Sequence, residues 1–186
     1  MSSVLVISGS PANPSRTEKL GEHVSGELTA SGHEVEHLRV RALPADSLLG
    51  ADFDDPAIRA AVAQVETADG VVLATPTYKA AYSGLLKAFL DLLPQFGFAG
   101  KAVLPLATGG SVAHVLSIDY ALRPVAHSLG ARHVVQSFFL LDEHLAVVGE
   151  DLEVHPDSTK PLADVIEQFD KALDGVPHDT ALGRTA

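Results

Sequence analysis

A dense group of hydroxyl side chains and one arginine follows the first apolar run of the chain. The run covers residues 4–7, and the polar group is Ser8, Ser10, Ser15, Arg16 and Thr17. The apolar run predicts a buried strand, and the residues after the loop predict a helix, so this group surrounds a helix N-terminus. Hydroxyls and backbone amides donate hydrogen bonds to phosphate oxygens, and a guanidinium adds positive charge. The segment predicts a site for a terminal phosphate, with a simple capped turn as the alternative.

This loop matches neither of two well-known nucleotide-binding motifs. It lacks the pattern G-x-x-x-x-G-K-[ST], and its glycines do not form G-x-G-x-x-G. A nucleoside triphosphatase and an enzyme with the dinucleotide fingerprint are therefore disfavoured. A single phosphate monoester on a mainly apolar ring system fits the loop better, and FMN is the common ligand of that description.

Two later loops carry groups suited to a flat ring. One loop contains Pro76, Thr77, Tyr78 and Lys79, and the other contains Thr108, Gly109, Gly110 and Ser111, with His114 close behind. A proline turn can present backbone amides and an aromatic edge, while glycines let the backbone approach a ring closely. Each loop also has a plain structural alternative, since Tyr78 could be a core aromatic and His114 a polar residue at a helix start.

Hydrophobic periodicity predicts the elements that position these loops. Strands are expected over residues 4–7, 35–40, 70–75, 103–107 and 132–138, with an interruption or irregular pairing at Pro105. Helices are expected over 20–28, 56–67 with Asp55 as its cap, 82–93, 115–129, and 162–173 after a cap at Asp157. This alternation predicts an α/β fold, a flavodoxin-like doubly wound five-stranded parallel sheet of order 2-1-3-4-5. The three loops then meet at the carboxyl edge of the sheet.

Composition narrows the classes of function. The 186 residues carry a formal net charge of −11 without a basic cluster, which disfavours nucleic acid as a partner. The chain has no cysteine, so disulfides, thiolate nucleophiles and iron–sulfur clusters are excluded. No apolar run is long enough for a membrane span, and we expect a cytoplasmic protein. One domain is expected over residues 1–174, followed by a disordered tail over 175–186.

One segment matches a metal-binding motif but is not predicted to bind a metal. Residues 33–37 read H-E-V-E-H, which matches a zinc-protease pattern that requires a helix. The residues alternate as in a strand, which would hold the two histidines about 13 Å apart. No metal site is therefore predicted.

Longer stretches of the sequence resemble a known family. Residues 76–93 read PTYKAAYSGLLKAFLDLL and residues 103–124 read VLPLATGGSVAHVLSIDYALRP, with residues 8–17 in support. In these stretches the chain resembles the NADPH-dependent FMN reductases of the flavodoxin-like superfamily, especially the alkanesulfonate-associated reductases that supply two-component monooxygenases. The resemblance is weaker over residues 41–55 and beyond Phe139. It implies that the first loop holds the FMN phosphate and that the other two loops, with His114, cradle the isoalloxazine ring.

The resemblance also implies a reaction and an assembly. A hydride would pass directly from NADPH, or from NADH, to FMN, without a catalytic side chain, and a flavin-dependent monooxygenase is the expected partner. Tyr120 points away from the apolar stripe of its predicted helix. By resemblance it would lie at a subunit interface of a homo-oligomer, a dimer or a tetramer, in a helical turn widened to a π-bulge. Two alternatives stay open: a quinone or azo reductase that keeps FMN bound, and a flavodoxin-type electron carrier.

Overall fold

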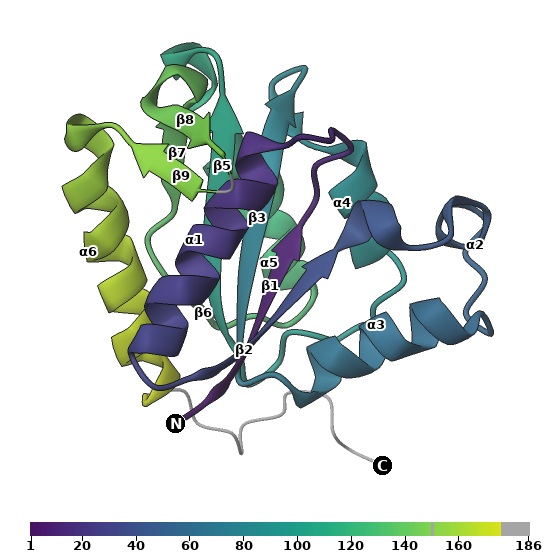
Figure 1. Cartoon of the computed structure of the whole chain (residues 1–186). Helices are drawn as coiled ribbons and strands as arrows, with labels where there is room; N and C mark the ends of the chain where they lie inside the picture. The colour runs from purple at the N-terminus through teal and green to yellow at the C-terminus, as the bar shows by residue number, and fades with distance from the viewer. Residues whose placement is uncertain (150, 176–186) are drawn as a thin grey trace.

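A twisted parallel sheet forms the centre of the computed structural model, which describes residues 1–149 and 151–175 (Figure 1). Its strand order is β2-β1-β3-β5-β6, with the short strand β4 beside β3 and the strand β7 beside β5. Its strands are β1 Ser3–Ser8, β2 Glu34–Arg39, β3 Gly70–Tyr78, β4 Ala81–Tyr82, β5 Ala102–Gly109, β6 His133–Val134 and β7 Phe138–Leu141. Apart from the extra strand β4 and the divided edge strand, this is the predicted doubly wound order.

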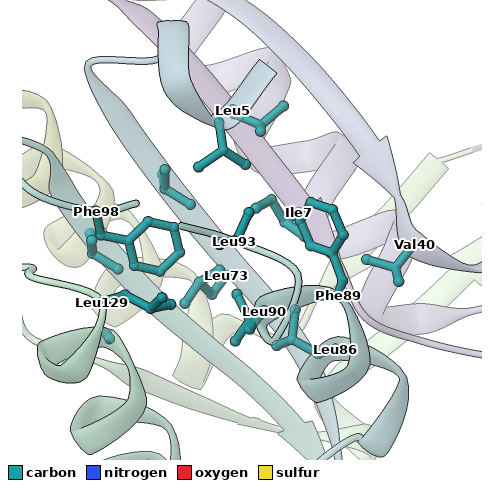
Figure 2. Close-up of a cluster of buried hydrophobic side chains, with 14 of the residues drawn as sticks. Leu5, Ile7, Val40, Leu73, Leu86, Phe89, Leu90, Leu93, Phe98 and Leu129 are labelled. Carbon is teal, nitrogen blue, oxygen red and sulfur yellow. The ribbon is translucent and has the colours of Figure 1, made fainter. Parts of the chain in front are cut away.

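Helices cover both faces of the sheet (Figure 1). The helices are α1 Arg16–Ala30, α2 Ala45–Leu49, α3 Pro56–Thr67, α4 Gly84–Leu90, α5 Arg123–Ser128 and α6 Pro156–Leu173. Leu5 and Ile7 of β1 belong to the core cluster of α3, α4 and α5, part of which is drawn in Figure 2. Val4 and Val6 belong to the second cluster, with α1 and α6. Successive side chains of β1 therefore reach opposite faces, as expected for a strand buried on both sides.

Pro105 lies inside β5, where the edge strand divides into β6 and β7. Ala102 and Val103 pair with β6, and pairing with β7 resumes at Leu106. The carbonyl of Val103 accepts a hydrogen bond from the amide of Val135, so residue 105, two positions on, faces the same edge. Because proline has no amide hydrogen to donate, the ladder is broken at that position. The interruption expected at Pro105 is confirmed, and the predicted strand 132–138 is replaced by β6 and β7.

Tyr82 lies in strand β4, and the prediction that it opens a helix was wrong. Thr77 pairs with Tyr82 in an antiparallel hairpin, which places Tyr82 before the helix begins. Ser83 is the N-cap of α4, since its Oγ accepts a hydrogen bond from the amide of Leu86 at 3.0 Å. The helix then ends at Leu90 rather than Leu93. A polar side chain that satisfies a free amide sets the start of this helix more strongly than the apolar periodicity does.

The helix predicted over residues 115–129 is divided into separate parts. A 3₁₀ turn covers Val112–His114, a π-helical turn covers Ile118–Leu122, and α5 follows. The amide of Arg123 donates to the carbonyl of Ile118, five residues earlier. Pro124 has no amide hydrogen and cannot donate to the carbonyl of residue 120, which favours the wider turn at this point. Tyr120 lies in the π-helical turn and is 79% exposed.

The segment after the sheet contains a hairpin that the sequence analysis did not predict. A 3₁₀ turn, Asp142–His144, leads into β8 Leu145–Val148, which pairs antiparallel with β9 Asp151–Val154. His155 caps α6 instead of Asp157, because its Nδ1 accepts the hydrogen bond of the Asp157 amide. The expected disordered tail lies, except for Gly175, outside the described residues. Within the described part of the chain, no helix combines the length and the apolar character that crossing a membrane requires.

Candidate functional site

The carboxyl ends of β1, β3 and β5 border a cavity of about 720 Å³. Nine of the predicted site residues line it: Ser10, Ser15, Arg16, Thr17, Pro76, Thr77, Tyr78, Thr108 and Gly109. The parallel topology brings these residues together, since every loop that follows a strand leaves the sheet at the same edge. The other predicted residues, Ser8, Lys79, Gly110, Ser111 and His114, do not line the cavity.

The part of the cavity wall formed by the N-terminus of α1 is rich in hydrogen-bond donors. Ser15 caps α1 by accepting the amide of Glu18 at 3.1 Å, which leaves the amides of Arg16 and Thr17 without a partner inside the helix. The hydroxyls of Thr17 and Thr108 share a buried hydrogen bond of 2.8 Å. Arg16 also lines the cavity. A helix N-terminus with hydroxyls and a guanidinium favours an anion with several oxygens, such as a phosphate.

Ser8, which does not line the cavity, is buried and is bonded to a histidine. Its Oγ lies 2.6 Å from Nε2 of His37 on the neighbouring strand β2. His33, the other histidine of the H-E-x-x-H pattern, bonds to Asp170 instead. Burial, together with the charge of Arg39, lowers the pKa of His37 to about 4. His37 is therefore neutral at physiological pH.

The low pKa of His37 predicts a loss of stability in acid. The unfolded chain takes up this proton near pH 6.5, but the folded protein resists it until about pH 4, so the free energy of unfolding falls between these values. Because His37 is only partly buried, we expect wild type to lose about 1 kcal/mol more than His37→Gln between pH 7 and pH 5. Urea denaturation of both proteins at the two pH values measures this difference, and equal losses would contradict it.

Gly9 and Ser83 hold the first loop against helix α4. A Cβ atom on Gly9 would lie 2.5 Å from Cβ of Leu86, a distance that real structures do not tolerate. The hydroxyl of Ser83 donates to the carbonyl of Gly9 and accepts the amide of Leu86. The amide of Ser83 in turn donates to Thr75 Oγ1 at 2.9 Å. Ser83 therefore connects the first loop to the end of β3, a role that the sequence analysis did not assign.

The second loop is a tight hairpin turn between β3 and β4. Lys79 and Ala80 both have positive φ angles, 51° and 65°. This is the backbone conformation of a two-residue hairpin turn, which usually selects Asn-Gly because other residues are strained there. The turn leaves Tyr78 at the cavity wall, 48% exposed, and directs Lys79 to solvent.

The two glycines of the third loop have different surroundings. A Cβ atom on Gly109 would lie 2.8 Å from Cζ of Phe139 and 3.4 Å from Cβ of Thr77. A Cβ atom on Gly110 would meet nothing closer than Asp142 Oδ2, at 3.8 Å. Gly109 therefore allows a close approach at the cavity wall, whereas Gly110 does not need to be glycine for steric reasons.

This difference predicts unequal effects of two matched substitutions. Gly109→Ala forces the Phe139 ring or Thr77 to move and is expected to lower the free energy of unfolding by about 1 to 2 kcal/mol. Gly110→Ala, one residue away, is expected to change it by less than about 0.5 kcal/mol. Urea denaturation of both flavin-free variants checks the prediction, and equal effects of the two would overturn it.

Part of the cavity wall was not predicted from the sequence. Ala12 and Pro14 line it from the first loop, and the segment after β7 contributes Asp142, Glu143, Leu145, Ala146 and Val147. Arg16 connects the two parts, since its Nε donates to the carbonyl of Leu145 at 3.1 Å. A usable signal existed, because Gly149 stands between two short apolar stretches, as in a hairpin turn.

The cavity fits a flat, singly phosphorylated ring. The Oγ1 atom of Thr77 is buried at the cavity and has no hydrogen-bond partner among the described residues. Buried hydroxyls are rarely left unpaired in proteins, so a ligand with polar ring atoms would satisfy it. With the donors around the N-terminus of α1 for a phosphate, the residues present suit FMN.

Known proteins resemble the chain over most of its length. A family model described as NADPH-dependent FMN reductase matches residues 2–146. The protein named FMN reductase (NADPH) from Escherichia coli K12 is 42% identical over 170 residues, which cover 91% of this chain and 89% of that protein. The Pseudomonas putida KT2440 protein of the same name is 41% identical over 190 residues, which cover 97% of this chain and 92% of that protein.

A solved structure agrees with these matches. The apo form of an NADH:FMN oxidoreductase, EMOB, superposes with a TM-score of 0.76 at 46% identity, covering 95% of this chain and 88% of that one. The family model spans well over half of the sequence, and two relatives above 40% identity extend over nearly all of it. The chain therefore belongs to the NADPH-dependent FMN reductase family.

Proposed function

We propose that the protein transfers a hydride from NADPH or NADH to FMN in the cavity at the carboxyl edge of the sheet. The observation that carries the proposal is that two chemically different sets of groups line this cavity. One set is the N-terminus of α1 with its hydroxyls and Arg16, and the other is Tyr78, Gly109 and the unpaired hydroxyl of Thr77. A phosphate suits the first set and a flat conjugated ring suits the second.

The residues of the chain bind and orient rather than react. Arg16 and the first amides of α1 hold the phosphate, and this fixes the position of the ring against Tyr78 and Gly109. FMN, when bound, supplies the ring that accepts the hydride. The apolar side chains of Leu145 and Val147 in β8 help to exclude water from the cavity. No side-chain acid, base or nucleophile is needed for a direct hydride transfer.

A second copy of the chain is the proposed partner of an exposed apolar surface. Val112, Val115, Leu116 and Tyr120 are 67%, 48%, 53% and 79% exposed, and all follow the third loop. Several large apolar side chains exposed along one short segment are typical of a subunit interface. We propose a homo-oligomer, a dimer or a tetramer, in which Tyr120 and the π-helical turn contact the neighbouring subunit. Tyr120→Asp should weaken this assembly in sedimentation experiments.

A flavin-dependent monooxygenase is the proposed acceptor of reduced FMN. The names of the relatives, FMN reductase (NADPH), support the part of this proposal in which FMN is the molecule that is reduced. An enzyme that keeps FMN bound and reduces quinones or azo compounds is the alternative. Gel filtration separates the two cases, because a substrate flavin is lost from the protein and a prosthetic flavin is retained.

NADPH oxidation by purified protein with added FMN is the direct test of the proposed reaction. We expect turnover that requires both FMN and a reduced nicotinamide nucleotide, well above the rate of the mixture without protein. NADH in place of NADPH establishes the nucleotide preference. FMN binding without turnover would instead favour the electron carrier, and failure of the protein to bind FMN would remove both readings.

A further inference from the structure

Three side chains that can bind a metal converge at the base of the β8–β9 hairpin, outside the flavin cavity. His144 precedes β8, His155 follows β9, and Asp157 lies in the first turn of α6. One ligand atom from each of these residues lies within 4.8 Å of the others. The proposed hydride transfer uses none of the three.

Hydrogen bonds already orient both histidines. Nδ1 of His144 lies 2.7 Å from Oγ of Ser158, and Nδ1 of His155 accepts the amide of Asp157 at 3.3 Å. Their rings are stacked, with centroids 4.8 Å apart and planes at 22°. Nδ1 of His155 also lies 3.6 Å from Oδ2 of Asp157, so the lone pair that accepts the amide faces the carboxylate. His144 can donate to Ser158 through Nδ1 and keep the lone pair of its other nitrogen for a metal, whereas His155 would bind through Nδ1 in exchange for its long amide contact.

Small side-chain rotations would bring the three ligand atoms to one ion. Ligand atoms around a tetrahedral zinc ion lie roughly 3.3 Å apart. The side chains of His155 and Asp157 are 49% and 77% exposed, so they can turn without disturbing the core. The dipole of α6 weakly opposes a cation at an exposed helix start, and the carboxylate of Asp157 offsets this effect.

We propose that His144, His155 and Asp157 bind one divalent transition-metal ion and thereby tie the two ends of the β8–β9 hairpin together. The amide of His155 already donates to the carbonyl of His144 at 2.9 Å, so the ion would reinforce an existing contact. Two imidazoles and one carboxylate suit Zn²⁺, Co²⁺, Ni²⁺ or Cu²⁺, whereas Mg²⁺ and Ca²⁺ prefer all-oxygen ligands.

The position of the site gives the ion a structural consequence for the cavity. Leu145, directly after His144, lines the cavity and accepts the hydrogen bond from Arg16. Ala146 and Val147 of the same strand also line it. An ion at the base of the hairpin would therefore restrict the movement of one cavity wall.

Zinc titration of the full chain, treated with chelator and followed by calorimetry, tests the site without flavin. We expect one Zn²⁺ per chain, no heat with Mg²⁺, and at least tenfold weaker zinc binding in His144→Ala and in Asp157→Asn. Asp157→Asn keeps the backbone amide that His155 caps, so its folding is preserved. His133→Ala, which removes an exposed histidine of β6, is the matched control and should bind zinc as wild type does.

Two results would overturn the proposal: wild type that binds no zinc at micromolar free metal, or variants that bind it as wild type does. A second measurement, the rate of FMN dissociation, depends on the proposed function because it requires that FMN binds in the cavity. Zn²⁺ should slow FMN dissociation in wild type and have no effect in Asp157→Asn. Because the calorimetric titration contains no flavin, failure of FMN binding and failure of the metal site are distinguishable.

Discussion

Replacement of Arg16 by alanine is expected to weaken FMN binding by about 10- to 150-fold while riboflavin binding changes little. Riboflavin has the same ring but no phosphate, so it does not use the charge of Arg16. Arg16 is the arginine of the cavity wall, in a chain whose formal net charge is −11. The overall charge repels a phosphate, so the affinity for it depends on local donors. Fluorescence titration with both flavins measures the ratio.

The comparison with riboflavin separates two roles of Arg16. Its Nε also donates to the carbonyl of Leu145, so the variant loses a contact with the hairpin. An equal loss for FMN and riboflavin would mean that Arg16 acts through the hairpin and not through the phosphate. Arg16→Lys keeps the charge without the planar fork and should lie between wild type and Arg16→Ala. Arg132→Ala, at an exposed position before β6, is the control.

The order of the sheet could be predicted because the central strands are apolar on both faces. The run from Val4 to Ile7 has few alternatives to a buried strand, and the same holds for residues 70–75. Even the effect of Pro105 on the edge of the sheet followed from a property of one residue, the absence of an amide hydrogen. Such features depend on local chemistry and need no knowledge of distant contacts.

Features that depend on distant partners were not predictable in the same way. The turn at Lys79 and Ala80 adopts a conformation that its residue types disfavour, so the hairpin that contains Tyr82 was missed. Ser8 belongs to the predicted polar group, but its neighbour His37 comes from another strand and binds it instead. The cavity wall formed by β8 is short, and the contact of Leu145 with Arg16 joins residues 129 positions apart in the sequence. Tertiary contacts, rather than local propensity, decide the conformation of this turn, the partner of Ser8 and the position of the hairpin.

Replacement of Phe89 by alanine is expected to lower the free energy of unfolding by about 3 to 5 kcal/mol, the largest effect on stability that we predict. The Phe89 side chain is 0% exposed and belongs to the cluster in Figure 2, with Ile7 of β1 and Val40 after β2. The truncation removes apolar contact area and leaves a cavity that close-packed neighbours fill only in part. Urea denaturation of the flavin-free chain measures the loss.

Phe53→Ala is the matched control, because Phe53 is 59% exposed and the same truncation there should cost less than about 1 kcal/mol. The position of Phe89 adds a second expectation. It lies on α4, whose residue Leu86 packs against Gly9 in the first loop. A weakened α4 should therefore also weaken FMN binding. Riboflavin binding should fall by the same factor, because the substitution removes no group that donates a hydrogen bond to the phosphate. A loss of FMN binding alone would mean that α4 specifically supports the groups proposed to bind the phosphate.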